Sequence, residues 1–248
     1  MDLAVVVRPT LPPERLVEQA QAAEAAGASE LWLWEDCFLT GGIAATATAL
    51  AATERIVVGI GILPAPVRNA AFAAMELATL ARLHPGRLHA GFGHGLAEWM
   101  HQVGAKPASQ LTLLEEVTVA VRALLRGETA DTEGRYVRLR GVALDHPPET
   151  VPPVSLGVRG PKSLRLSGRF ADGTVLDASA GPDDVAAARA AIDEGRSAAG
   201  RTDPHRITVF AEPDADRDAF AAAGSDCLVF QSSDEDVALD LTRAFPAR

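Results

Sequence analysis

The sequence of 248 residues is poor in cysteine and lacks long apolar runs. Its two cysteines, Cys37 and Cys227, lie far apart, and two thiols in a chain of this size make no disulfide framework. We therefore expect a reducing, cytoplasmic environment. No basic segment leads into an apolar stretch at the N-terminus, so we expect no signal peptide. Arginine or glutamate interrupts every apolar run before it reaches the roughly 20 residues of a membrane span, so we expect no membrane partner.

Lysine is also scarce, because the 23 basic residues are 21 arginines and two lysines, Lys106 and Lys162. With 33 acidic residues the formal net charge is -10, and the pI is about 5.1. A protein that follows the phosphates of a nucleic acid needs a basic face. The acidic balance therefore argues against a nucleic-acid partner.

What the sequence does contain is a regular alternation of short apolar runs with alanine-rich runs. Short runs that are apolar throughout are typical of strands in a parallel sheet that is buried on both faces. We predict strands at 3–7, 30–34, 56–62, 87–91, 154–158, 174–176, 206–210 and 226–230. We predict helices at 13–26, 43–52, 70–83, 110–126, 161–170, 182–199, 214–223 and 234–245.

Eight such β/α units predict an α/β fold of the (β/α)8 TIM-barrel type. An open, doubly wound parallel sheet is the alternative. No linker or internal repeat divides the chain, so we expect one barrel domain over 1–248. Residues 130–152 interrupt the rhythm, since they alternate like strands and then contain several prolines. We interpret them as a hairpin insertion rather than a core element.

Two adjacent acids, Glu35 and Asp36, follow the second predicted strand. In a barrel of this kind the chemistry lies at the C-terminal ends of the strands. Neighbouring side chains on extended backbone point to opposite sides, so at most one of the two faces the mouth. A carboxylate there can accept a proton or a hydrogen bond from a ligand. The alternative is that these residues only cap a loop or helix.

The fourth predicted strand leads into the glycine-rich segment GFGHGL at 91–96. It fails the G-x-G-x-x-G dinucleotide pattern, because Leu96 stands where the third glycine belongs. Its glycines either let a flat or anionic ligand approach the backbone or form a plain tight turn. His94 and His101 lack helical i, i+4 spacing and a third ligand nearby, so we expect no metal site.

The segment GVRGPKSLR at 157–165 has the features of an anion site. Pro161 suits the first position of a helix, whose free N–H groups bind anions. Arg159 and Lys162 would add positive charge on an otherwise acidic protein. The alternative is an ordinary helix start with solvated cations.

Three segments together resemble the luciferase-like flavin and deazaflavin oxidoreductases. These are LWLWEDCF at 31–38, the long stretch at 55–105 and GVRGPKSLRLSGRFADGTVL at 157–176. The chain is most similar to the branch that uses coenzyme F420, the methylenetetrahydromethanopterin reductase-like proteins. The resemblance covers about 1–180 well and the remainder loosely, and it implies the same barrel.

The resemblance also implies a cofactor ring over the C-terminal mouth and assigns residues to it. A cis peptide between Gly61 and Ile62 would support the ring from behind. Asp36 matches the acidic position of the family and would move a proton or donate or accept a hydrogen bond there, with Glu35 as the second choice. The implied cofactor-binding residues are Gly61, Ile62, Gly93, His94, Gly95, Gly157, Val158, Arg159, Gly160, Pro161 and Lys162.

The function implied is hydride transfer between F420 and a small organic substrate. The alternatives are an FMN-dependent luciferase-like monooxygenase, which would need a flavin or F420 reductase partner, and a cofactor-binding barrel with little turnover. A further hypothesis, an enzyme that acts on a phosphorylated sugar, is supported only by the predicted anion site. Cys37 stands where sugar-phosphate dehydrogenases of the family carry histidine, and only about 15 residues join Phe210 to Asp226, where relatives have a long insertion. We expect a homodimer.

Overall fold

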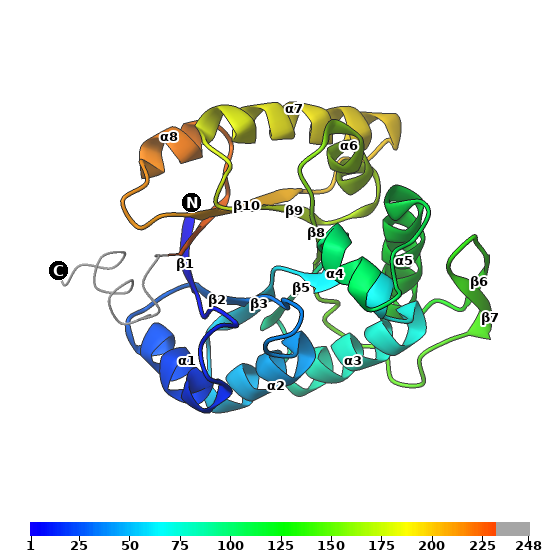
Figure 1. Cartoon of the computed structure of the whole chain (residues 1–248), viewed down its shortest axis with the longest axis horizontal. Helices are drawn as coiled ribbons and strands as arrows, with labels where there is room; N and C mark the ends of the chain where they lie inside the picture. The colour runs from blue at the N-terminus through cyan, green and yellow to red at the C-terminus, as the bar shows by residue number, and fades with distance from the viewer. Residues whose placement is uncertain (232–248) are drawn as a thin grey trace.

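Eight parallel strands close into a barrel in the computed structural model, which describes residues 1–231. β1 pairs with both β2 and β11, and β3 pairs with β5, so the sheet has no open side and the predicted barrel is confirmed over the doubly wound alternative (Figure 1). The barrel strands are β1 (Asp2–Val6), β2 (Glu30–Leu33), β3 (Val57–Ile60), β5 (Leu88–Gly93), β8 (Val154–Gly157), β9 (Gly173–Leu176), β10 (Arg206–Ala211) and β11 (Cys227–Phe230).

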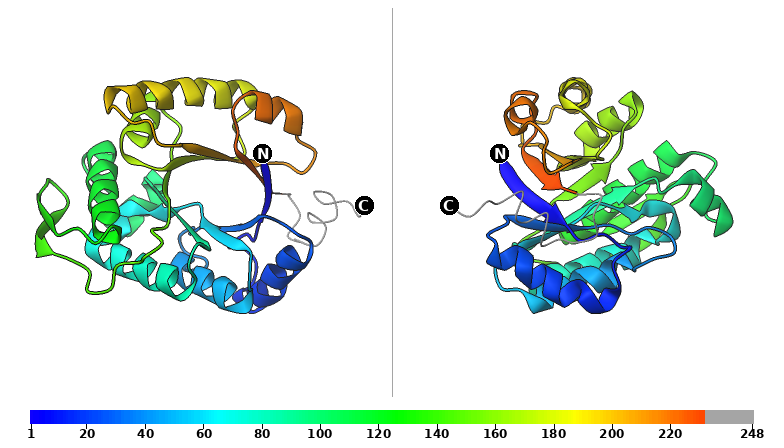
Figure 2. Two further views of the ribbon diagram at one scale, coloured as in Figure 1. Left: turned by 180° about the vertical axis from the view of Figure 1, so that it is seen from behind. Right: turned by 60° about the vertical axis from the view of Figure 1, so that its left-hand side comes forward.

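Helices surround the barrel on its outside, as both views in Figure 2 show. They are α1 (Leu16–Ala25), α2 (Gly42–Ala52), α3 (Ala70–Leu83), α4 (Ala97–Gln102), α5 (Gln110–Leu125), α6 (Pro161–Phe170), α7 (Pro182–Ala198) and α8 (Arg217–Ala222), with short 3-10 turns η1 (Pro13–Arg15) and η2 (Ala65–Val67). α4 has no counterpart among the predicted helices. The predicted helix at 234–245 lies outside the described residues.

Helix α3 shows why these runs become helices. Its alanines and leucines recur every three or four residues, and the buried ones form one face against the barrel. Asn69 precedes the helix and accepts hydrogen bonds from the backbone N–H groups of Ala71 and Phe72, so two N–H groups of the first turn have a partner. Both ends of α3 and of α6 fall where the sequence predicts them.

The inside of the barrel is a packed core and not a channel. Trp32 of β2 is fully buried there, with its ring centroid 5.0 Å from that of His89 and 5.9 Å from that of Phe210. Gly59 on the neighbouring strand makes room for it, because a Cβ at that position would lie 2.5 Å from the indole ring. A second and larger core fills the layer between the strands and the helices.

The predicted insertion is an antiparallel hairpin of β6 (Ala130–Glu133) and β7 (Arg138–Val142) that projects beside α5 (Figure 1). Glu116 of α5 anchors its tip, accepting hydrogen bonds from the backbone N–H groups of Arg135, Tyr136 and Val137. The hairpin takes no part in the barrel sheet. Within the described residues, no helix is long and apolar enough to cross a membrane.

Candidate active site

A pocket of about 740 Å³ lies at the C-terminal ends of the barrel strands. This volume falls in the upper part of the range of roughly 300–1,000 Å³ that is usual for small-molecule sites. Seven of the eight barrel strands or the loops that follow them contribute to it. The lining residues are Trp34, Glu35, Asp36, Gly61, Ile62, Pro64, His94, Gly95, Leu96, Trp99, Gly157, Val158, Arg159, Gly160, Ser163, Val175, Asp177, Ala178, Ser179, Phe210 and Gln231.

The predicted site residues divide into two groups. Both Glu35 and Asp36 line the pocket, so the expectation that at most one of them faces the mouth is wrong: β2 ends at Leu33, and the acids lie in the loop after it. The pocket also contains eight of the implied cofactor contacts: Gly61, Ile62, His94, Gly95, Gly157, Val158, Arg159 and Gly160. Gly93, Pro161 and Lys162 do not line it. Lys162 and Pro161 lie exposed in the first turn of α6, next to Gly160. Contact of any of the eleven residues with a cofactor stays a prediction, as do the roles of the two acids.

Ile62 forms the wall of the pocket beside β5 and β8. The peptide bond between Gly61 and Ile62 is cis, as the resemblance implies, and it ends β3 before the short β4 (Leu63–Pro64) pairs with β5. A Cβ at Gly93 would lie 2.8 Å from Cγ1 of Ile62, and a Cβ at Gly157 would lie 2.5 Å from its Cγ2. These two glycines therefore make room for Ile62, which gives the glycine-rich strand ends a structural role.

The loop after β2 also contains a cis peptide, between Cys37 and Phe38, which the sequence does not predict. Glu35 holds this loop against the loop after β3. Its carboxylate accepts hydrogen bonds from Arg68 Nη1 at 2.5 Å and Nη2 at 2.7 Å, and from the backbone N–H of Gly42 at 2.6 Å. Its own N–H donates to the carbonyl of Ile62 at 3.2 Å.

The protonation of Glu35 follows from these contacts. Burial raises the pKa of this carboxyl, but the hydrogen bonds from Arg68 and Gly42 and the charge of Arg68 outweigh burial and hold the pKa below its ordinary value. Glu35 is therefore ionised at neutral pH and has its oxygens engaged, which suits a positioning residue better than a proton carrier.

Asp36 has a different environment from its neighbour. It is half-buried in the pocket wall, and Oδ2 accepts a hydrogen bond of 2.8 Å from Trp34 Nε1. The Trp34 ring in turn packs edge-on against Phe210, with centroids 5.9 Å apart and an interplanar angle of 82°. The carboxylate of Asp36 is thus oriented by an aromatic pair and lines the pocket without an arginine partner in the described structure.

His94 links the loop after β5 to the first turn of α6. Its Nε2 shares a hydrogen bond of 3.2 Å with Ser163 Oγ. Burial lowers the pKa of His94, and a hydrogen bond with the backbone of Gln110 opposes this effect without reversing it. His94 is therefore neutral at physiological pH. Gly95, which follows, has a φ of 67°, a left-handed conformation that favours glycine.

The start of α6 presents the features expected of an anion site. Gly160 caps the helix with extended backbone and Pro161 occupies the first turn, so the following N–H groups have no partner within the helix. Arg159 beside it forms an ion pair with Asp177, which follows β9. Burial raises the pKa of Asp177, but the hydrogen bonds from the backbone N–H of Ser179 and from the Arg159 guanidinium outweigh burial and hold the pKa below its ordinary value. Asp177 is therefore ionised at neutral pH.

Sequence reasoning missed several residues that line the pocket or contact its lining. Arg68, Ser163 and Phe210 lie 33, 69 and 176 positions from their partners Glu35, His94 and Trp34, and no local pattern marks these pairs. Trp34 and Phe210 could be suspected only because they end predicted strands. Among residues 1–231, no three His, Cys, Asp or Glu side chains gather in a way that could hold a metal ion.

The fold and this pocket together define a (β/α)8 protein with a pocket of small-molecule size at the C-terminal mouth. Comparison with known proteins narrows the class, because residues 3–223 match the luciferase-like monooxygenase family. The chain belongs to this family.

Two curated relatives are similar over most of the chain. A 5,10-methylenetetrahydromethanopterin reductase of Methanolobus tindarius is 30% identical over 212 residues, covering 85% of this chain and 64% of the relative. An F420-dependent hydroxymycolic acid dehydrogenase of Mycobacterium tuberculosis (strain ATCC 25618 / H37Rv) is 32% identical over 237 residues, covering 89% of this chain and 62% of the relative. The chain thus spans less than two thirds of the length of these relatives.

A solved structure shows the same fold. The coenzyme F420-dependent tetrahydromethanopterin reductase of Methanopyrus kandleri superimposes with a TM-score of 0.85, at 18% identity, over 98% of this chain and 97% of that one. At this identity the likeness establishes the architecture of the barrel.

Proposed function

We propose that this luciferase-like oxidoreductase uses F420 and transfers a hydride between this deazaflavin and a small organic substrate. The observation that carries the proposal is the arrangement of Ile62, on its cis peptide, between the acidic wall at Asp36 and the helix start at Gly160. The 32% identity to an F420-dependent dehydrogenase supports the choice of cofactor.

The residues present fit a flat cofactor that carries a phosphate. Ile62 and Val158 offer apolar surface to a ring, and the N–H groups at the start of α6, with Lys162 nearby, suit the phosphate. His94 and Ser163, which share a hydrogen bond, line the same pocket. When bound, the deazaflavin supplies a carbon that accepts or gives up a hydride.

The chain itself would handle the proton. Asp36 is the carboxylate in the pocket that is oriented but not neutralised by an arginine in the described structure, so we assign it the proton at the substrate oxygen. Glu35 positions the loop through Arg68 and takes no part in proton transfer. The Glu35 carboxylate joins Gly42, which follows the loop after β2, to Arg68, which follows β4. Glu35 therefore acts by fixing the position of the pocket wall.

Binding experiments with two cofactors test the proposal. The purified protein is titrated with F420 and, separately, with FMN, and the heat or fluorescence change is recorded. Saturable binding of F420 at one site per chain, tighter than that of FMN, is the expected result. Binding of FMN without F420 would overturn it in favour of an FMN-dependent monooxygenase, the function for which the family is named.

A further inference from the structure

The interior of the barrel contains a column of three aromatic side chains that starts at the pocket and leads toward the N-terminal end. Trp34 lines the pocket, and its ring centroid lies 5.9 Å from that of Phe210 on β10. The centroid of Phe210 lies 5.9 Å from that of Trp32, which is fully buried on β2. Both contacts are edge-on, with interplanar angles of 82° and 81°, a favourable geometry for aromatic pairs. The three rings therefore form one continuous contact path through the core.

The neighbouring strand is shaped around these rings. A Cβ at Gly59 would lie 2.5 Å from the indole of Trp32. A Cβ at Gly61 would lie 3.0 Å from Trp32 and 3.2 Å from Phe210. Only 5% of the chain is aromatic, yet two of its three tryptophans stand in this column. Core packing accounts for the space that the glycines leave, but it does not account for the polar partners of the two indoles.

Each tryptophan of the column donates a hydrogen bond to its own carboxylate. Trp34 Nε1 donates to Asp36 Oδ2 at 2.8 Å, and Trp32 Nε1 donates to Glu30 Oε2 at 2.7 Å. An indole that has lost an electron is a far stronger acid at this nitrogen than the intact ring, so a carboxylate at this distance can take up its proton. Burial raises the pKa of Glu30 above its ordinary value although the charge of Arg206 opposes this, which makes the carboxylate a better proton acceptor.

The column ends in a buried thiol. Cys227 on β11 is 0% exposed and belongs to the same interior cluster as Trp32 and Phe210. Its Sγ donates a weak hydrogen bond of 3.9 Å to Glu30 Oε2, the same atom that accepts from Trp32. Glu30 and Cys227 are the first residues of β2 and β11, so this end of the column lies at the N-terminal side of the barrel. The indole and the thiol therefore share one proton acceptor.

From this arrangement we infer that the column carries one-electron oxidation out of the pocket, from Trp34 to Trp32 and then to Cys227, and so protects the pocket against oxidative damage. Phe210 is the contact between the two indoles and is not itself oxidised. The inference goes beyond the proposed function, because it requires only that a one-electron oxidant, of the class of a photoexcited flavin, reaches Trp34.

Each transfer of an electron is matched by a proton. An electron leaves Trp34 for the oxidant, and the Nε1 proton passes to Asp36. Trp32 then gives an electron to Trp34, which regains its proton from Asp36, and the Nε1 proton of Trp32 passes to Glu30. Finally Cys227 gives an electron to Trp32 and a proton to Glu30, while Trp32 regains the proton that Glu30 had accepted. The net change is the loss of one electron and one proton from Cys227, with the electron on the oxidant and the proton on Glu30.

Photo-oxidation with FMN tests this inference. FMN in excess over the protein is excited with light in the presence of oxygen, which converts a sulfur radical into oxidised sulfur acids. The protein is then unfolded and alkylated, and mass spectrometry measures the remaining thiol at each cysteine. Cys37 is the internal comparison, because it is only half-buried and directly follows Asp36. A diffusing oxidant reaches Cys37 and not the buried Cys227, whereas the column predicts that the thiol of Cys227 is lost as well.

Variants show whether the aromatic rings carry the oxidation. Trp34→Phe and Trp32→Phe each remove an oxidisable ring with its N–H donor, and each should abolish the loss of the Cys227 thiol. Phe210→Leu breaks the ring contact with both tryptophans in place, so oxidised Trp34 should accumulate instead. It also serves if Trp32→Phe does not fold, which circular dichroism shows. Trp99→Phe is the matched control, since Trp99 lines the pocket without a ring contact in the described structure, and loss of the Cys227 thiol should be unchanged.

The outcomes separate this inference from the proposed function. Loss of the Cys37 thiol alone, or of neither thiol, in the natural chain would overturn the inference. Loss of the Cys227 thiol at an unchanged rate in folded Trp34→Phe and Phe210→Leu would also overturn it. The excited FMN needs only to collide with the pocket, so none of these results depends on the binding of F420. Failure of F420 to bind would overturn the proposed function and would leave the oxidation of Cys227 to be decided by its own measurement.

Discussion

The two ends of the barrel differ in whether every charged side chain has a partner of opposite charge. At the C-terminal end, Asp36 lines an open pocket and the nearby apolar side chains Phe38 and Leu96 are exposed. At the N-terminal end, charged groups are paired across elements. Arg206 at the start of β10 binds Asp2 at the start of β1 and Glu30 at the start of β2, each at 2.8 Å. The C-terminal end thus has a pocket with an unpaired carboxylate among its described lining residues, and the N-terminal end has charged groups that hold strands together.

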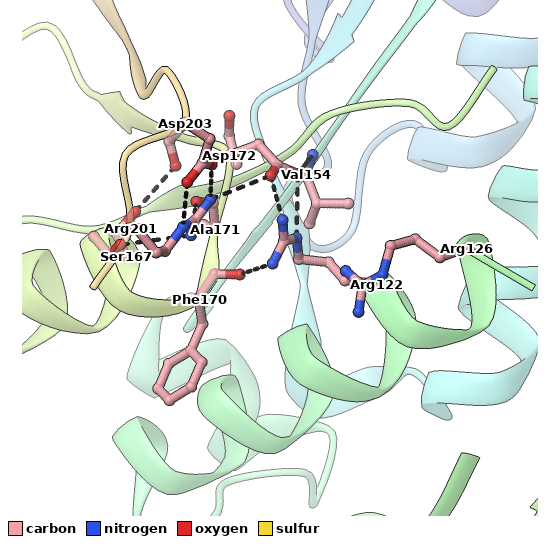
Figure 3. Close-up of polar contacts among 12 residues, drawn as sticks. Arg122, Arg126, Val154, Ser167, Phe170, Ala171, Asp172, Arg201 and Asp203 are labelled. Atoms are coloured by element: carbon pink, nitrogen blue, oxygen red, sulfur yellow. Dashed lines mark hydrogen bonds and ion pairs between the residues drawn. The ribbon is translucent and has the colours of Figure 1, made fainter. Parts of the chain in front are cut away.

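A second network at the N-terminal end joins helices to strands, as Figure 3 shows. Arg122 of α5 donates to the carbonyl of Phe170 at 2.7 Å and forms an ion pair with Asp172. Asp172 also accepts from the backbone N–H of Val154 at 3.0 Å, where β8 begins. Arg201 approaches from the other side and pairs with Asp203. These charges satisfy one another and leave none for a ligand.

The number of hydrogen-bond and ion-pair partners thus separates structural charged residues from those that face the pocket, which the residue type alone does not. Glu35 and Asp36 are neighbours in the sequence, yet Glu35 accepts three hydrogen bonds, as the paired acids at the N-terminal end of the barrel do. Asp36 has one, from Trp34. The following predictions test this contrast, from the largest expected effect to the smallest.

Replacement of Asp36 should remove turnover and spare the fold. For Asp36→Ala we expect a loss of roughly 100- to 10,000-fold in kcat, the range for a general acid or base. The affinity for F420 should change by less than about tenfold. Steady-state kinetics and cofactor titration measure the two effects, with Asp131→Ala on the exposed hairpin as the control. Turnover that survives in Asp36→Ala would make Asp36 structural.

Replacement of Glu35 should act on stability instead. Glu35→Ala leaves the Arg68 guanidinium, 18% exposed, without its carboxylate, which should lower the free energy of unfolding by about 3–5 kcal/mol. Urea unfolding monitored by circular dichroism measures this. Glu35→Gln keeps the shape and should retain most turnover. If Glu35→Gln folds normally but is as inactive as Asp36→Ala, the assignment of roles to the two acids is wrong.

Acidification should weaken the barrel through two buried histidines. Burial, together with the charge of nearby arginines, lowers the pKa of both His89 and His205 to about 4 from 6.5. Below pH 6.5 the unfolded chain binds protons that the folded chain does not, so stability falls as pH falls toward 4. We expect about 2 kcal/mol lost per histidine between about pH 7 and pH 5.

Unfolding curves at these two pH values measure that loss. His205→Gln breaks the hydrogen bond of 2.9 Å to Thr174 and lowers stability at both pH values, but it should remove about half of the pH dependence. An unchanged pH dependence in His205→Gln would show that other groups are responsible.

We expect the smallest loss of stability from replacing Arg122, at the N-terminal end of the barrel. Arg122→Met should cost about 1–2 kcal/mol of stability, because its hydrogen bonds to Phe170 and Asp172 are partly buried. F420 affinity and turnover per folded molecule should not change. Arg126→Met is the matched control one turn along, since its partner Glu128 is exposed and the loss should stay below about 0.5 kcal/mol. Altered cofactor binding in Arg122→Met would contradict the view that the charged residues of this network at the N-terminal end serve stability alone.

Much of the fold could be predicted because its strands and helices follow from hydrophobic patterns within short segments of the sequence. The apolar strands and the periodic alanines of α3 predicted the barrel, and no strand end differs from its predicted position by more than two residues. The run at 56–62 was predicted as one strand, but the cis peptide after Gly61 ends it. Periodicity cannot show such a bond, and the expected one came from the resemblance.

The site was less accessible, because its contacts join distant segments. The sequence placed Asp36, His94 and Gly160 near one mouth, since parallel strand ends meet there. It could not show that Arg68 neutralises Glu35 or that Gly93 and Gly157 accommodate Ile62, since these depend on side-chain packing between separate strands. Reasoning from strand ends finds the location of a site, and the partners of each residue then decide its role.

A single-turnover experiment tests the central claim, that hydride transfer takes place in the pocket at the C-terminal end of the barrel with Asp36 as the proton carrier. Protein saturated with oxidised F420 is mixed with a broad panel of small organic hydride donors, and loss of the visible absorbance of the cofactor is followed for the natural chain and for Asp36→Ala. The account predicts rapid loss of absorbance in the natural chain and a rate at least about 100-fold lower in Asp36→Ala with F420 still bound. Equal rates in the two proteins, or no reduction of bound F420 by the natural chain, would contradict it.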